Sequence, residues 1–217
     1  MARVLVTERT VVDAAKAGKK SLHVPADAIV TPAAKDRAHQ LGLLLEGPAP
    51  ASSPSPAATQ TPTGKPESET VAVGSDHGGF QLKEILKTHL TGMGCQIIDV
   101  GTHDDEACDY PDFAYAVAQL VATGKSGKGI MIDSVGIASA MVANKVPGIR
   151  AACCHDSFTA HSSREHNNAN VLTLGGKVIG TEMAKSIVGE WLRTPYAGGR
   201  HQKRLAKITD IEKKYVK

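Results

Sequence analysis

Residues 71–79 read Val-Ala-Val-Gly-Ser-Asp-His-Gly-Gly, a short apolar run that leads into a glycine-rich turn. Directly after this turn, apolar residues recur at helical spacing from Leu82 to Met93, which predicts a strand followed by a helix. The alternation continues along the chain, with strands expected at 71–73, 96–100, 129–132, 149–153 and 170–174, and helices at 82–93, 113–121, 138–145, 183–192 and 205–211. Five such units predict an α/β fold with a doubly wound, Rossmann-like, five-stranded parallel sheet.

A compositional break separates this body from a shorter N-terminal segment. Six of the eleven prolines lie between Gly47 and Glu69, so we expect residues 47–69 to form a disordered linker that transmits few contacts. Residues 1–46 are predicted to be a small α+β appendage with helices near 10–15 and 31–41 and strands near 21–25 and 43–45. Thr31-Pro32 is a specific start signal for the second helix. The body occupies residues 70–217.

Composition excludes several classes of protein. The net charge is only +3 and the basic residues are scattered, which argues against a nucleic-acid partner. No apolar run approaches the roughly 18 residues of a membrane span, and residues 1–10 lack the apolar core of a signal peptide. The four cysteines form no disulfide framework, so we expect reduced thiols in a cytoplasmic protein.

In a parallel sheet of this kind, ligands bind at the carboxyl ends of the strands. The first strand ends in Asp76-His77-Gly78-Gly79, where glycines allow a ligand to approach the backbone, although an Asp that caps the next helix explains the pattern about as well. The third strand ends in Asp133-Ser134-Val135-Gly136. Burial makes such a carboxylate a better base near neutral pH, and the competing interpretation is again a helix cap.

Two further clusters indicate a ligand that has hydroxyl groups and a phosphate. Residues 164–170 read Arg-Glu-His-Asn-Asn-Ala-Asn, and three amides around one histidine suggest a polar network. Arg200 and Arg204 lie one helical turn apart at the start of the last helix, as a phosphate clamp requires, although a solvated basic helix start has the same pattern. The histidines and cysteines lack the spacing of a metal site, so we expect no metal and no cofactor.

The motifs together resemble the type B ribose-5-phosphate isomerase family, which includes the galactose-6-phosphate isomerase subunits. The resemblance covers roughly residues 70–215 and is carried by five motifs in order, at 75–79, 109–112, 143–150, 164–172 and 198–201. It implies a metal-independent aldose–ketose isomerisation of a sugar phosphate through an enediolate, most simply ribose 5-phosphate to ribulose 5-phosphate. It also implies a homodimer or homotetramer with sites at the subunit interface.

The resemblance assigns a role to individual residues. His166 would assist ring opening, Asp76 would handle a sugar hydroxyl and Asn167 would bind the sugar. His77, Arg200 and Arg204 would hold the phosphate. The backbone N–H groups from Ser134 through Gly136 and Ile137 to Ala138 would stabilise the enediolate.

One motif departs from the family. Many members have Cys-Gly-Thr-Gly-x-Gly after the third strand, with the cysteine as base, whereas residues 133–138 here read Asp-Ser-Val-Gly-Ile-Ala. We expect Asp133 to replace the thiol as base, because a carboxylate can perform enolisation; Asp112 is the rival. Two alternatives stay open: isomerisation of a tetrose or hexose phosphate, and a non-catalytic sugar-phosphate-binding subunit.

The N-terminal segment resembles, more weakly, short modules on enzymes of bacterial microcompartments. This likeness implies shell or cargo proteins as partners of residues 1–46 and a location inside such a compartment. A small solubility or oligomerisation module is the equal alternative.

Overall fold

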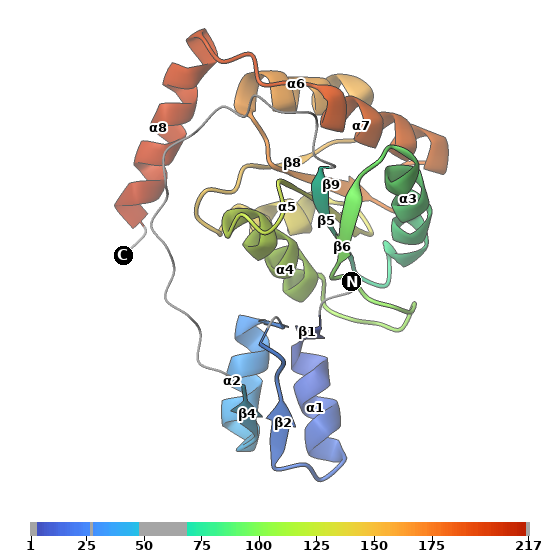
Figure 1. Ribbon diagram of the computed structural model, residues 1–217, viewed down its shortest axis with the longest axis vertical. Helices are drawn as coiled ribbons and strands as arrows, with labels where there is room; N and C mark the ends of the chain where they lie inside the picture. The colour runs from blue at the N-terminus through green and yellow to red at the C-terminus, as the bar shows by residue number, and fades with distance from the viewer. Residues whose placement is uncertain (1–3, 27, 48–68, 216–217) are drawn as a thin grey trace.

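The computed structural model describes residues 4–26, 28–47 and 69–215. Its body is built on one five-stranded parallel sheet with the strand order β6-β5-β7-β9-β8, which confirms the predicted fold class (Figure 1). The strands are β5 (Thr70–Ser75), β6 (Gln96–Asp99), β7 (Lys128–Asp133), β8 (Ala151–Cys153) and β9 (Val171–Gly175). The central strands β5, β7 and β9 are nearly continuous apolar runs, because helices bury them on both faces.

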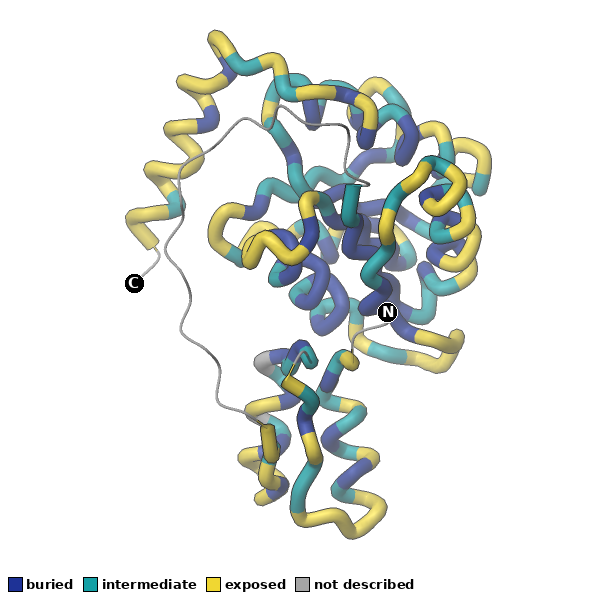
Figure 2. The backbone as a smooth tube through the Cα atoms, in the orientation of Figure 1, coloured by how far each residue is buried: buried dark blue, intermediate teal, exposed yellow. Residues whose placement is uncertain are grey.

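Helices cover both faces of the sheet, and Figure 2 shows the buried backbone concentrated in the sheet and the helices against it. One core joins the sheet to α3 (Phe80–Gly92), α6 (Ser157–Asn167) and α7 (Thr181–Arg193). A second core joins it to α4 (Tyr110–Ala122) and α5 (Ile137–Ala143). The last helix, α8 (Arg200–Tyr215), contacts α6 at the edge of the body and is mostly exposed. Among the described helices, none is long and apolar enough to cross a membrane.

Helix α6 is the helix of the body that the sequence pattern did not predict; in the N-terminal segment, strands Leu5–Val6 and Ile29–Val30 were not predicted either. Its residues read Ser-Phe-Thr-Ala-His-Ser-Ser-Arg-Glu-His-Asn, and only Ala160, Ser163 and Arg164 are buried. So few buried positions give no apolar period. The start of the helix is nevertheless well defined, because the Asp156 carboxylate accepts from the Thr159 N–H at 2.8 Å.

The N-terminal residues form a small α+β unit, which we call the head. Two parallel strand pairs, β1–β3 and β2–β4, accompany two helices, and Thr31 caps α2 by accepting from the Ala34 N–H at 3.2 Å. The elements are β1 (Leu5–Val6), α1 (Glu8–Lys16), β2 (Ser21–His23), β3 (Ile29–Val30), α2 (Pro32–Leu41) and β4 (Leu44–Glu46). Most of the predicted linker, residues 48–68, lies outside the described residues.

The head packs against the body, contrary to the expectation of few contacts. Ile29 is buried in the second core together with Phe113, and Leu5 packs against the same cluster. The Arg9 guanidinium pairs with the Glu106 carboxylate in the loop after β6. In Figure 1, β1 lies beside the end of α4. Apolar side chains on the strands of the head supply this contact.

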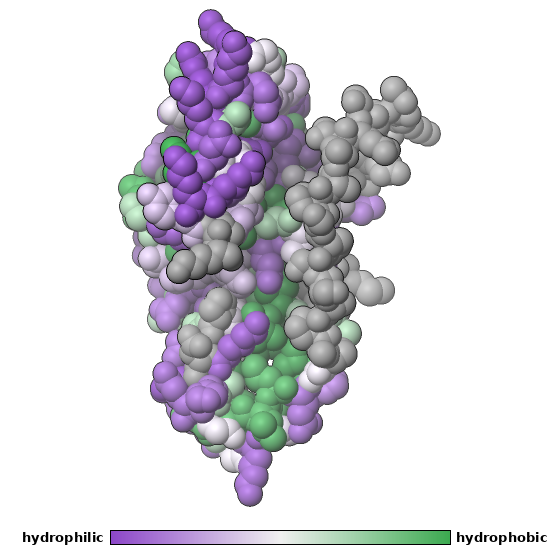
Figure 3. All heavy atoms as spheres, turned by 90° about the vertical axis from the view of Figure 1, so that its left-hand side faces the viewer, coloured by the Kyte–Doolittle hydropathy of each residue, from purple (hydrophilic) through white to green (hydrophobic). Residues whose placement is uncertain are grey.

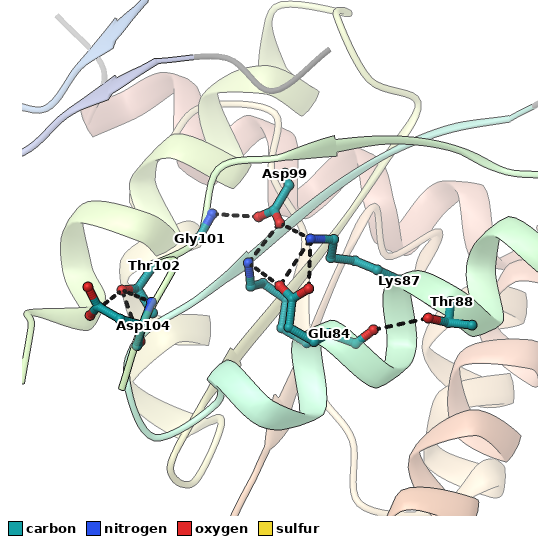
Figure 4. Close-up of polar contacts among 8 residues, drawn as sticks. Glu84, Lys87, Thr88, Asp99, Gly101, Thr102 and Asp104 are labelled. Carbon is teal, nitrogen blue, oxygen red and sulfur yellow. Dashed lines mark hydrogen bonds and ion pairs between the residues drawn. The ribbon is translucent and has the colours of Figure 1, made fainter. Parts of the chain in front are cut away.

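A buried ionic network fixes the end of β6 to α3 (Figure 4). Lys83 Nζ lies 2.7 Å and Lys87 Nζ 2.6 Å from Asp99 Oδ2, while Asp99 Oδ1 accepts from the Gly101 N–H at 2.9 Å. Burial opposes the ionisation of Asp99, but these three donors outweigh it and hold the pKa of the carboxyl below its ordinary value. The network therefore anchors the first residues of the loop that leads to α4.

We expect Lys83→Met to lower the free energy of unfolding by about 3 kcal/mol, the low end for a broken buried pair, because Lys87 still reaches Asp99. Lys87→Met is the matched control: its side chain is 29% exposed, and its loss should cost no more than about 1 kcal/mol. Urea denaturation at pH 7 measures both. Because the pKa of Asp99 is lowered in the fold, the stabilisation should be lost as the pH falls through that value. Equal losses in the two variants would contradict a buried Lys83–Asp99 anchor.

Candidate active site

The carboxyl ends of β5 and β7 bring two buried acidic side chains into one region, as the strand pattern predicted. Asp76 and Asp133 are each 5% exposed. Asp76 Oδ1 accepts from the Gly79 N–H at 3.0 Å. Burial raises the pKa of Asp76, and the charge of Asp133 adds to this effect. The raised pKa makes Asp76 a carboxyl group suited to proton transfer.

Glycine is required for the loop after β5 to lie this close to the end of β7. A Cβ on Gly78 would lie 2.2 Å from Ser134 Oγ, and one on Gly79 would lie 2.2 Å from the Ile132 carbonyl oxygen. A side chain at Gly79 would therefore require the backbone to move, and one at Gly78 would displace the Ser134 side chain. The glycines of the motif therefore let the Asp76 loop and the Asp133 loop touch.

The Asp133 carboxylate is turned onto its own loop. Oδ1 accepts from the Val135 N–H at 2.7 Å and from the Gly136 N–H, while Oδ2 accepts from the N–H of Ser139 at 3.1 Å and from its hydroxyl. The helix-cap interpretation of Asp133 thus describes its contacts in this structure. Two N–H groups that the enediolate was expected to use, those of Val135 and Gly136, are occupied by Asp133.

Two side chains that support this loop were missed by the sequence analysis. Ser139 donates to Asp133, and Thr173 on β9, also buried, donates from Oγ1 to the Gly136 carbonyl at 2.7 Å. Gly136 has a φ of 87°, which favours glycine and lets the loop turn into α5. The role of Thr173 depends on the pairing of β7 with β9 and has no local signal in the sequence. Ser139 lies only six residues after Asp133, and its contact is of the kind that the helix-cap interpretation of Asp133 implies.

His77 leaves the same end of β5 and is held by the backbone of Cys108. The N–H and the carbonyl oxygen of Cys108 each lie 3.2 Å from His77 Nδ1. An amide N–H can only donate and a carbonyl oxygen can only accept, so the tautomer of the ring decides which of the two groups is hydrogen-bonded to Nδ1. Either contact fixes the ring against the backbone of Cys108. We call Asp76, His77 and the 133–138 loop, with Ser134, Gly136, Ile137 and Ala138, the strand-end half-site.

The remaining predicted residues gather elsewhere, around the end of α6 and the start of α8. The His166 ring stacks on His201 with centroids 4.4 Å apart, and its Nε2 lies 3.0 Å from Glu165 Oε2. Asn167 follows His166 in the last turn of α6, and the exposed side chains of Arg200 and Arg204 lie on α8. We call His166, Asn167, Arg200 and Arg204 the helix-end half-site.

The helix-end half-site is rich in positive charge. Burial lowers the pKa of His201, and the nearby charges of His166, Arg200 and Arg204 lower it further. The upper part of the face that carries α8 is strongly hydrophilic in Figure 3. Two exposed guanidiniums beside a neutral histidine are suited to an anionic group.

One chain does not bring the two half-sites together. Helix α6 runs back across the sheet, so that Asn170, three residues after its end, accepts from the Gly129 N–H at the start of β7. Asp133 lies four residues further along β7, about 13 Å away at about 3.3 Å per residue. His77 and the two arginines, expected on one phosphate, are therefore at opposite ends of the sheet within a chain.

Comparisons with known proteins place this arrangement in a family. A model of the ribose/galactose isomerase family matches residues 71–208. Ribose-5-phosphate isomerase B of Escherichia coli is 46% identical over 66% of this chain and 97% of its own length. D-erythrulose-4-phosphate isomerase of Pectobacterium atrosepticum is 40% identical over 64% of this chain and 92% of its own.

A solved structure agrees with the sequence relatives. Ribose-5-phosphate isomerase B of Clostridium thermocellum superposes with a TM-score of 0.67 at 48% identity, covering 68% of this chain and 99% of its own. The match spans the body, and the head precedes the first residue of the family model. The motifs and the sheet of this chain agree with these matches. The chain belongs to the ribose/galactose isomerase family of sugar-phosphate isomerases.

Proposed function

We propose that this protein interconverts ribose 5-phosphate and ribulose 5-phosphate through an enediolate, in an active site completed by two copies of the chain. The observation that carries the proposal is the pairing of two buried carboxyl groups at the strand ends with a separate cluster of arginines and histidine at α6 and α8. Two relatives named ribose-5-phosphate isomerase B support the pentose.

Two copies are needed because each chain carries the half-sites at opposite ends of its sheet. Exposed apolar side chains accompany both: Val135, Ile137 and Met141 near the strand-end half-site, and Ile208 and Ile211 on α8. Exposed apolar side chains gathered in this way mark surfaces that bind another protein. A homodimer that places α8 of one copy over the strand ends of the other would bury both sets and complete the phosphate site.

In the composite site the phosphate is held by His77 from one copy and by Arg200 and Arg204 from the other. His166 protonates the ring oxygen as its bond to C1 breaks, while the C1 hydroxyl loses its proton to water and becomes the carbonyl. Asn167 binds a sugar hydroxyl. Asp76 exchanges a proton with a hydroxyl of the open chain, a task that its raised pKa suits. The N–H groups of Ile137 and Ala138, at the start of α5, face the developing enediolate charge.

Asp133 removes the C2 proton in this proposal. Its position at the end of β7 favours the role, whereas the hydrogen bonds from Val135, Gly136 and Ser139 oppose it because they occupy both carboxylate oxygens. Asp112, the rival base, lies in the first turn of α4 and faces the head rather than Asp133. Kinetic measurements on variants of Asp133 and its partners therefore test this role.

The tetrose relative favours a second candidate substrate, a four-carbon sugar phosphate, because its overall identity to this chain is close to that of the pentose relatives.

We also propose a cytoplasmic location, with residues 1–46 as a targeting segment that binds shell or cargo proteins of a microcompartment. A reporter fused to residues 1–46 should co-purify with shell proteins in a host that makes them. Diffuse localisation of the reporter in that host would contradict a targeting role for residues 1–46.

The purified chain should isomerise sugar phosphates without added metal, with its highest kcat/KM for the five-carbon substrate. A coupled assay against four-, five- and six-carbon sugar phosphates measures this. Arg200→Ala should raise KM by about 10- to 100-fold, because a charge-assisted bond is worth about 1.5–3 kcal/mol. Lys213→Ala, an exposed cation further along α8, is the control and should leave KM unchanged. An unchanged KM in both Arg200→Ala and Arg204→Ala would show that these two arginines do not hold the phosphate.

Asp133→Asn should lower kcat by about 10²–10⁴-fold, the usual cost of losing a general base. Ser139→Ala is the matched control for the loop, because it removes one donor to the same carboxylate and keeps the carboxylate itself. Its loss of kcat should be much smaller. Solvent exchange of the C2 proton, followed by NMR, separates the chemical step from binding. Similar losses in both variants would show that Asp133 acts only as a cap, which leaves Asp76 as the base.

A further inference from the structure

The loop between β6 and α4, residues 100–109, has one side toward the strand-end half-site and one side toward the head. On the inner side, Cys108 holds His77 through its backbone at 3.2 Å. On the outer side, Cys108 lines two clefts of about 750 and 240 Å³ between the head and the body. A single residue of this loop therefore touches both the candidate phosphate ligand and the head.

Contacts from the head reach the loop and the turn of helix that follows it. The Arg9 guanidinium on α1 pairs with the Glu106 carboxylate, two residues before Cys108. Thr7 and Arg9 line both clefts together with Cys108. Because the Arg9–Glu106 pair is exposed, its contribution alone is small.

A second contact lies just beyond the loop, where the head lies against a buried carboxyl group. Asp112, in the first turn of α4, is 9% exposed, and Thr31 of the head is fully buried. Burial raises the pKa of Asp112, and the nearby Thr31 hydroxyl and Glu8 backbone of the head oppose this effect. Ile29 and Leu5 close the contact by packing into the core that contains Phe113.

We propose that the head is a clamp on the 100–109 loop, which it fixes from outside so that Cys108 keeps His77 in place for the phosphate. Ile29, Glu106 and Asp112 are then positioning residues, and the inference rests on the proposed function for the role of His77. The loop begins at the Lys83–Asp99 anchor and ends at α4, so the head immobilises the segment between two fixed points. The family model starts at residue 71, and the head supplies this contact in addition.

The test compares full-length variants that undock the head with a variant that alters the head elsewhere. Ile29→Asp places a charge in the apolar contact, whereas Leu44→Asp changes an exposed residue on the outer strand pair of the head and is the matched control. Undocking should lower the fraction of molecules with His77 in place. We expect KM for the sugar phosphate and the inhibition constant of inorganic phosphate to rise by about 3- to 10-fold, with kcat little changed.

A charge swap provides an independent measurement. Glu106→Arg should raise KM through repulsion with Arg9, and adding Arg9→Glu should restore it. Hydrogen exchange should show faster exchange of residues 101–109 in Ile29→Asp but not in Leu44→Asp.

Unchanged KM and phosphate inhibition in Ile29→Asp, or an equal effect in Leu44→Asp, would overturn the clamp while the isomerase activity stands. If the unaltered chain isomerises no sugar phosphate, the proposed function fails instead. The clamp is then tested by calorimetric titration with inorganic phosphate and by hydrogen exchange of residues 101–109. Equal phosphate affinity, or equal hydrogen exchange, in Ile29→Asp and Leu44→Asp would overturn it.

Discussion

All five strands of the body point the same way, and this one direction decides where its chemistry lies. Side chains that follow a strand gather at the carboxyl end of the sheet, which is how Asp76, His77 and Asp133 meet. Side chains at the end of a return helix lie at the amino end, where α6 leaves His166 and Asn167. The two ends are separated by roughly four residues of strand, about 13 Å, and a change of side-chain rotamer cannot span that distance. A substrate that needs both sets therefore needs two chains.

The strand-end half-site shows a conflict between holding a charge and using it. Asp133 gains several hydrogen bonds from its loop, and these bonds define the path of the backbone into α5. The same bonds occupy both oxygens and turn the carboxylate toward its own loop. Asp76 has a different environment, in which burial and the neighbouring charge of Asp133 raise its pKa. Two carboxyl groups with such different surroundings are suited to different tasks, one to holding the loop and one to exchanging a proton.

The sheet and most of its helices could be predicted because each buried strand is an apolar run and most helices carry an apolar stripe. The candidate residues at the ends of β5 and β7 followed from strand direction alone. Helix α6 could not be predicted, since its polar sequence has few buried positions. The support from Thr173 and Cys108 depends on which strands and loops become neighbours, and Ile29 gave no local sign that it would pack on Phe113. Strand ends are local in sequence, whereas these contacts join distant segments.

Mixing two inactive variants tests the composite site most directly. Asp133→Asn damages the strand-end half-site and His166→Ala the helix-end half-site, so each protein alone should have almost no isomerase activity. After dissociation and reassociation at equal amounts, half of the dimers are mixed, and each mixed dimer contains one site free of both changes. We expect recovery of about a quarter of the original activity. If mixed dimers, isolated through two different affinity tags, stay as inactive as the parent variants, the two half-sites do not combine across copies of the chain.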